Sequence, residues 1–325
     1  MIKKIFLFLF VTIVLITSCK QEEKIKEVKL EGFVFGTTYH ITYLNRVDYQ
    51  KSIDSLFYLV NKSLSTYIPT SDISKINKGD STVVIDDMFL EVFQKSKRIY
   101  KETNGYFDPT VCNLVNAWGF GYKREKRDLD TLQVKELMKQ VGLDKVTLKG
   151  RAIQNKFKGA CLDFNSIAKG YGIDVVGRFL ESKNTQNYLV EIGGEIRVRG
   201  KNIRNKRWKV AIDDPNADGT RSVSRVIELS NQSMASSGNY RKFRVGANGQ
   251  KYVHTINPKT GFATESNLLS ATVYGAVDCA DVDAYATAFM AMGLEKAKEF
   301  LKNNSQIKVV LLFVNKDGNI EEFTN

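Results

Sequence analysis

Alternation of apolar and polar residues predicts strands at several separated places along the chain. Residues 33–44 alternate and are rich in β-branched and aromatic side chains, which is typical of a half-buried strand. A Gly-Gly pair divides residues 187–200 into two further strands, and the Lys149-Gly150 turn divides residues 144–157 in the same way. Additional strands are predicted in residues 207–215, 224–230 and 306–314.

Helical spacing of apolar residues alternates with these strands. It occurs in residues 48–64, 86–103 and 166–182, and residues 282–302 are predicted to form one or two helices. Residues 105–121 are predicted to form a glycine-bounded loop with a short helix. Because strands and helices mix without a regular βαβ rhythm, the predicted class is α+β: mixed, largely antiparallel sheets flanked by helices, in a single body spanning residues 33–325.

Composition is that of a globular protein, with 43% hydrophobic and 26% charged residues among 325. The formal net charge of +12 raises the question of nucleic-acid binding. However, the lysines and arginines are spread along the chain, without a long basic block or interleaved aromatic residues. We therefore expect no nucleic-acid partner.

The N-terminus has the pattern of a processing segment. A basic start, MIKK, precedes the apolar run IFLFLFVTIVLI, and LITSC then brings small residues up to Cys19. This pattern resembles a bacterial lipoprotein signal, with residues 1–18 removed, Cys19 lipidated and residues 19–32 serving as a tether. The alternative is a transmembrane anchor, for which about a dozen apolar residues are too few to span a bilayer comfortably.

Cysteine and histidine residues are too few and too scattered for a zinc site. Cys112, Cys161 and Cys279 have no C-x-x-C spacing and no obvious disulfide framework, so each is expected to be a small core residue. The two histidines exclude a three-histidine metal site. His40, inside an alternating strand, is expected to be a satisfied sheet residue, whereas His254, before an Asn-Pro turn, is open to a structural or a functional role.

Familiar nucleotide-binding and hydrolase motifs are missing from the chain. There is no G-x-x-x-x-G-K-[ST] phosphate loop, no G-x-G-x-x-G after a strand and no G-x-S-x-G elbow. The stretch GGEIRVRG is glycine-rich, but a bulge between strands explains it equally well.

Three aspartates crowd the start of an alanine-rich helix in the stretch DCADVDAYATAF. Acids there could cap the helix and suit its dipole. Alternatively, Asp283 and Thr287 lie four residues apart and share one helix face, where a carboxylate and a hydroxyl are hard ligands suited to Mg²⁺. Asp278 and Asp281 fall on other faces and are interpreted as cap or solvent-exposed acids. Both possibilities remain open from spacing alone.

Eight separated blocks of the chain resemble, in order, those of the ApbE-like flavin transferases, the FAD:protein FMN transferases. The resemblance covers nearly all of the chain from Phe33 onward. The blocks are FGTTYHITY, LSTYIPTSDISKIN, GYFDPTVCNLVNAWGFG, LDFNSIAKGYGIDVV, YLVEIGGEIRVRG, MASSGNYRKF, HTINPKTG and ADVDAYATAFMAMG.

The resemblance implies a defined reaction. Family members cleave the FAD pyrophosphate with Mg²⁺, transfer FMN to a Thr or Ser hydroxyl of a target flavoprotein and release AMP. The targets are typically subunits of membrane redox pumps. Family members are commonly exported or lipid-anchored, which agrees with the signal that ends at Cys19. We therefore expect a lipid-anchored enzyme on the periplasmic side of a bacterial cell membrane, with the cytoplasmic membrane favoured over the outer membrane. Two alternatives are an FAD pyrophosphatase that produces FMN and AMP, and a non-enzymatic FAD-binding lipoprotein.

The resemblance also implies the site residues. Asp283, Thr287 and the main-chain carbonyl of Ser166 match the magnesium ligands of the family, and His254 matches a histidine often assigned proton transfer. The positions that match contacts to the flavin nucleotide are Phe35, Tyr67, Phe107, Asp108, Pro109, Asp163, Lys169, Ile256 and Ala286.

Overall fold

One long antiparallel sheet forms the centre of the molecule. The computed structural model describes residues 25–122, 128–155, 159–213, 223–239, 243–245, 251–263 and 266–325. In the sheet, neighbouring strands all run antiparallel, which confirms the predicted α+β class. The strand order is β1 (Lys26–Val34), β2 (Thr37–Asn45), β5 (Tyr188–Ile192), β6 (Glu195–Arg199), β9 (Gln232–Gly238), β12 (Leu268–Gly275), β13 (Ile307–Val314) and β14 (Ile320–Thr324).

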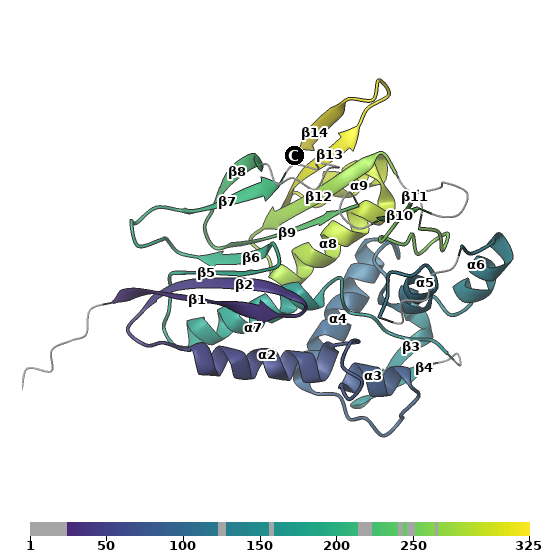
Figure 1. Ribbon diagram of the computed structural model, residues 1–325, viewed down its shortest axis with the longest axis horizontal. Coiled ribbons are helices and arrows are strands. Elements are labelled where there is room, and N and C mark those ends of the chain that lie inside the picture. Colours follow the sequence, from purple (N-terminus) through teal and green to yellow (C-terminus); the bar gives the residue numbers. More distant parts are fainter. Residues whose placement is uncertain are drawn as a thin grey trace, which may run out of the picture.

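Helices cover this sheet along one side (Figure 1). The long ones are α2 (Gln50–Leu64), α4 (Asp87–Glu102), α7 (Ala168–Ser182) and α8 (Cys279–Met292). Shorter ones are α3 (Asp72–Asn77), α5 (Cys112–Ala117), α6 (Thr131–Met138), α9 (Leu294–Lys302) and the 3₁₀ turns η1 (Pro109–Val111) and η2 (Leu143–Lys145). None of the helices in the described parts of the chain is both long and apolar enough to cross a membrane.

Helix α8 is the most deeply buried of the long helices. It packs between α7 and strands β9 and β12, and small residues such as Ala280, Ala284 and Ala288 allow these close approaches. A helix that is apolar on nearly every side belongs in a core. The carboxylate of Asp283, which this helix carries, therefore lies at the edge of the hydrophobic core.

The N-terminal strand differs from the prediction, because residues 33–44 belong to two strands. Phe35 (φ 51°) and Gly36 (φ 78°) turn the chain between β1 and β2. Strand β1 begins at Lys26, within the predicted tether 19–32, because Val28 and Leu30 alternate with charged residues and are buried. The folded body thus begins before residue 33. Residues 1–24, with the predicted signal and lipidation site, lie outside the described residues.

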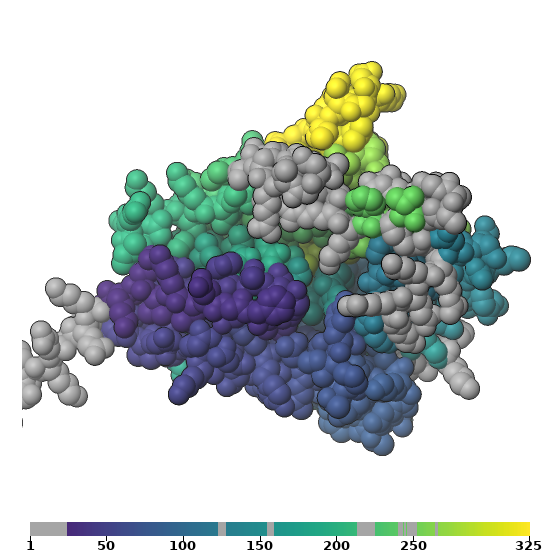
Figure 2. All heavy atoms as spheres, viewed as in Figure 1, coloured from purple at the N-terminus to yellow at the C-terminus, as the bar shows by residue number. Residues whose placement is uncertain are grey.

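The β1–β2 hairpin packs on helix α2, as the purple and blue residues in contact in Figure 2 show. The ring of Phe57 on α2 lies 5.1 Å from that of Tyr39 and 5.6 Å from that of Phe35, between centroids. This contact fixes one end of the sheet against the helical layer.

Three small hairpins complete the described structure. The first was predicted from the Lys149-Gly150 turn, the strands of the second were predicted but not their pairing, and the third lies close to the candidate site. They are β3 (Val146–Lys149) with β4 (Ala152–Asn155), β7 (Trp208–Asp213) with β8 (Val223–Leu229), and β10 (Phe243–Val245) with β11 (Lys251–Val253).

Candidate functional site

A cavity of about 720 Å³ opens where the sheet, the α7–α8 helix pair and several loops meet. Residues far apart in the sequence line it together. Ten of the residues predicted for the site are among them: Tyr67, Phe107, Asp108, Asp163, Ser166, Lys169, His254, Ile256, Asp283 and Thr287. The volume lies within the range of natural small-molecule sites.

Three other predicted residues are not among those that line the cavity. Phe35 packs its ring against Phe57, and Ala286 is fully buried in the core. The carbonyl of Pro109 accepts a hydrogen bond from the backbone N–H of Asp163 at 2.8 Å. Pro109 therefore helps to position Asp163, which lines the cavity, although Pro109 itself does not line it.

Asp283 and Thr287 line the same cavity, as expected for residues one helical turn apart on α8. Asp283 is only 4% exposed, and its Oδ2 accepts a hydrogen bond from the backbone N–H of Gly170 at 3.0 Å. Burial raises the pKa of Asp283, while the ammonium of Lys169 opposes that rise. The hydroxyl of Thr287 lies 3.4 Å from that of Ser237 on β9. Burying a carboxylate is costly unless positive charge and hydrogen bonds replace the lost water, so this position favours a cationic partner.

Glu195 is a buried acid of the site that sequence reasoning missed. Its Oε2 lies 2.6 Å from Nζ of Lys169, and both residues line the cavity. Burial raises the pKa of Glu195 to about 7. The nearby charge of Asp283 also raises this pKa, whereas the ammonium of Lys169 lowers it. Burial lowers the pKa of Lys169, but the two carboxylates outweigh it, so that its pKa is raised overall. The sequence feature that could have drawn attention to Glu195 is the Gly-Gly pair that precedes it.

That pair forms a two-residue hairpin turn, with Ile192 and Glu195 as partners across it. Gly193 (φ 64°) and Gly194 (φ 103°) both adopt positive φ, which glycine reaches without strain. The bulge that explained the pair equally well is therefore absent here, and the tight turn places Glu195 in the cavity wall.

The other two aspartates of the cluster are used to anchor helix α8. Asp278 pairs with Lys95 and Arg178, both at 2.8 Å, and Asp281 pairs with Lys95 at 3.1 Å. Asp278 occupies the N-cap position, but its side chain makes no capping bond. The capping acid is instead Asp174 on α7, which accepts from the backbone N–H groups at the first two positions of α8, both at 2.8 Å. The cluster thus divides into anchoring acids and one cavity acid.

The donor set at the cavity suits a hard cation. The oxygen donors are the Asp283 carboxylate and the Thr287 hydroxyl, and Ser166 lines the same cavity, two residues before α7 begins. Among the described residues no group of three or more His, Cys, Asp or Glu side chains is arranged so that it could hold a metal ion by itself. Oxygen ligands without sulfur or imidazole fit Mg²⁺ rather than zinc. The residues present therefore fit a magnesium ion.

Aromatic side chains line other parts of the cavity. Tyr67 keeps 63% of its surface exposed, whereas Phe107 is buried in the main core with 1% exposed. Tyr67 is thus the better placed of the two to stack on a flat ring. Apolar walls are added by Val115 and Phe120.

The two histidines occupy different settings. His254 is half-buried and follows β11 at the cavity wall, which favours the functional alternative. Nδ1 of His40 on β2 lies 2.7 Å from the carboxylate of Glu191, its partner residue on β5. His40 is therefore a satisfied sheet residue, as predicted, although it too reaches the rim of the cavity.

One prediction about the cysteines was wrong. Cys112 and Cys161 form a disulfide, with their Cα atoms 5.8 Å apart, whereas Cys279 is a free buried thiol as predicted. A separation of 49 residues gives no local signal, so the pairing could not be read from spacing.

Comparison with known proteins agrees with this geometry. The model of the ApbE family matches residues 35–311. The FAD:protein FMN transferase of Haemophilus influenzae is 38% identical over 312 residues, covering 91% of this chain and 89% of that protein. The FAD:protein FMN transferase of Vibrio cholerae is 34% identical, covering 94% of this chain and 93% of that protein.

Solved structures have the same fold. The flavin transferase ApbE from Vibrio cholerae superposes with a TM-score of 0.81 at 33% identity, covering 93% of this chain and 97% of that one. The apo form of the flavinyl transferase ApbE from Pseudomonas stutzeri gives 0.82 at 27% identity, covering 93% of this chain and 95% of that one.

Proposed function

The chain belongs to the ApbE family, and we propose that it acts as an FAD:protein FMN transferase. The observation that carries the proposal is the cavity in which Asp283, Thr287, Lys169 and His254 meet. These residues provide a buried carboxylate, a hydroxyl, a cation and an imidazole within one space large enough for a nucleotide. Such a set suits phosphoryl-type chemistry, which depends on positioning and charge stabilisation.

In the proposed reaction, a Ser or Thr hydroxyl of a target flavoprotein attacks the phosphorus on the FMN side of the FAD pyrophosphate. The new bond joins that hydroxyl oxygen to FMN, the P–O bond to the AMP side breaks, and AMP leaves. The hydroxyl proton must be accepted as the oxygen attacks, and we assign that role to His254 because its ring lies at the cavity wall.

Asp283, Thr287 and the Ser166 carbonyl would hold Mg²⁺ in this enzyme. When bound, the ion supplies positive charge against the pyrophosphate oxygens. Lys169, fixed by Glu195, adds a second positive charge in the same wall. Tyr67 offers an exposed ring for stacking. The other cavity residues at positions that match nucleotide contacts of the family are Phe107, Asp108, Asp163 and Ile256.

We further propose that the enzyme is lipid-anchored through Cys19 on the periplasmic side of the cytoplasmic membrane and modifies a subunit of a membrane redox pump. The apolar run, followed by the small residues that lead up to this cysteine, supports the anchor. The Cys112–Cys161 disulfide supports an exported protein, because disulfides persist mainly in oxidising compartments. Mass analysis of the mature chain should find a lipidated Cys19, and an unprocessed N-terminus would contradict the anchor.

The activity is tested by incubating the purified chain with FAD, Mg²⁺ and a candidate acceptor subunit. We expect the acceptor to gain the mass of one FMN while AMP appears in equal amount. Fast AMP release without acceptor would favour the pyrophosphatase instead. Intact FAD in every mixture would leave an FAD-binding lipoprotein and overturn the transferase.

A further inference from the structure

We propose that the Cys112–Cys161 disulfide is a clasp that holds two walls of the FAD site in register, so that its loss weakens FAD binding before it affects chemistry. The inference rests on the proposed function, because it takes the cavity to be the FAD site. It concerns the sulfur pair, which lies behind the cavity wall and outside the set of cavity-lining residues.

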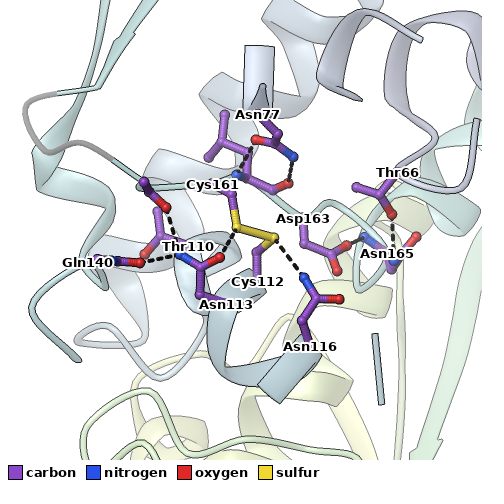
Figure 3. The surroundings of a disulfide bond; sticks show 12 residues. Thr66, Asn77, Thr110, Cys112, Asn113, Asn116, Gln140, Cys161, Asp163 and Asn165 are labelled. Carbon is purple, nitrogen blue, oxygen red and sulfur yellow. Dashed lines mark hydrogen bonds between the residues drawn. A yellow bond between two sulfur atoms is a disulfide. The ribbon is translucent and has the colours of Figure 1, made fainter. Parts of the chain in front are cut away.

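Each cysteine adjoins one cavity-lining segment. Phe107, Asp108 and Val111 come just before Cys112, and Asp163, Asn165 and Ser166 come just after Cys161. Figure 3 shows the sulfur–sulfur bond beside Asp163 and Asn165. The covalent link therefore joins the bases of two segments that both face the nucleotide space.

Hydrogen bonds also fix the segment after Cys161 to its surroundings. The Asn77 side chain on α3 bonds the backbone of Leu162 twice, at 2.7 and 2.8 Å, and Asn165 donates to the hydroxyl of Thr66 at 3.2 Å. These bonds fix the segment after Cys161 to Asn77 on α3 and to Thr66 in the loop before it.

Two hydrogen bonds link the segments directly. The Asp163 N–H donates to the Pro109 carbonyl at 2.8 Å, and the Asn113 side chain donates to the Gly159 carbonyl at 2.6 Å. They lie on either side of the disulfide along the chain. Hydrogen bonds open and close, whereas the disulfide, which lies between these two along the chain, is a permanent link between the segments.

The clasp also lies at the junction of two separate hydrophobic cores. Phe107, Leu162 and Phe164 belong to the main core, whereas Leu114 and Ile256 belong to a smaller core around Trp118. Both cores supply cavity walls, Phe107 from the first and Ile256 from the second. Without the covalent link, the smaller core can shift against the main one, and a small displacement across a binding site is costly for a ligand that touches both sides.

The test compares the wild-type chain with the double variant Cys112→Ala/Cys161→Ala. FAD affinity is measured by flavin fluorescence, and KM and kcat are measured from AMP release. We expect the dissociation constant and the KM for FAD to rise about tenfold while kcat stays within about twofold. Cys279→Ala, which removes a buried thiol outside the clasp, should leave FAD affinity and both kinetic constants unchanged.

The outcomes separate this inference from the proposed function. A lower melting temperature with unchanged FAD affinity would mean that the disulfide serves stability alone, and would overturn the clasp. Wild-type chain that binds FAD but releases no AMP would overturn the transferase, while the affinity comparison still tests the clasp. Should the double variant not fold, wild-type chain reduced with a dithiol, its two new thiols confirmed by alkylation, takes its place with the same expected loss of affinity.

Discussion

Nζ of Lys169 lies 2.6 Å from Oε2 of Glu195, and both side chains face the cavity that also holds Asp283. The Glu195 side chain is only 5% exposed, so its carboxylate is held in place by the surrounding protein and in turn orients the ammonium of Lys169. A buried charge requires a partner. Glu195 is therefore a positioning residue for the cation that we assign to the nucleotide.

The first prediction concerns Glu195→Gln. Glutamine keeps an acceptor oxygen but loses the charge, so Lys169 is drawn toward Asp283, its other acidic neighbour. We expect kcat/KM for FAD to fall about tenfold, measured as AMP release at varied FAD concentration. Glu228→Gln, which alters a surface pair with Lys209, should leave kcat/KM unchanged, and an unaltered Glu195→Gln enzyme would contradict the positioning role.

Two aspartates on helix α8 provide a second, matched prediction. Asp283→Asn removes the carboxylate at the cavity, and we expect FAD cleavage to fall at least about 100-fold, because the charge that would hold Mg²⁺ is lost. Asp281→Asn breaks pairs with Lys95 and Arg98 outside the cavity. It should retain most of the activity and lose about 1–3 kcal/mol of unfolding free energy, measured in urea, because the half-buried ammonium of Lys95 loses one charged acceptor. Equal loss of activity in both variants would contradict a separate role for Asp283 and would mean that the aspartates serve only to anchor α8.

Where local pattern decides the structure, the sequence was sufficient. Alternation and the Lys149-Gly150 turn predicted the β3–β4 hairpin, and alternation predicted β5 and β6 as strands on either side of the Gly-Gly pair. Gly150, Gly193 and Gly194 all adopt positive φ, which glycine reaches without strain. The i, i+4 spacing placed Asp283 and Thr287 in one wall because helix geometry fixes that relation.

Where partners lie far apart in the chain, the sequence was not sufficient. Strand β9 contains the serine-rich run SMASSG, which lacks alternation, yet it pairs in the sheet centre and packs against α8. Asp174 caps α8 from a position about a hundred residues away, and Glu195 meets Lys169 only after folding. Such contacts are set by tertiary packing, which no window of sequence contains.

The third prediction tests the hydroxyl of Thr287. Thr287→Val has nearly the same shape but no oxygen donor, whereas Thr287→Ser retains the donor. We expect the valine variant to need at least about tenfold more Mg²⁺ for half-maximal FAD cleavage, because one of few protein ligands is lost. The serine variant should stay within about threefold of wild type. Identical Mg²⁺ dependence in both variants would show that the hydroxyl does not hold the ion.

The fourth prediction uses the close approach of helices α7 and α8. A Cβ added at Gly170 would lie 2.4 Å from the backbone carbonyl oxygen of Cys279, so Gly170→Ala must push the helices apart. The displaced backbone N–H is the one that holds Asp283. We expect a loss of about 1–3 kcal/mol in unfolding free energy and a weaker Mg²⁺ response in the same assay. Normal stability and Mg²⁺ dependence would mean that the interface adapts without moving the carboxylate.

The last prediction follows from Asp108, whose burial raises its pKa from 3.8 to about 6 despite bonds from the Thr110 N–H and hydroxyl. Between these values the folded chain holds more protons at this site than the unfolded chain. The contribution of Asp108 to stability is therefore fully present below about pH 4 and is lost as the pH rises through about 6. Asp108→Asn removes this dependence while keeping an acceptor for Thr110. Measured by urea unfolding, the unfolding free energy of wild type should fall by up to about 3 kcal/mol relative to that of Asp108→Asn between about pH 4 and pH 7. A difference between the two proteins that does not vary with pH would contradict the raised pKa of Asp108.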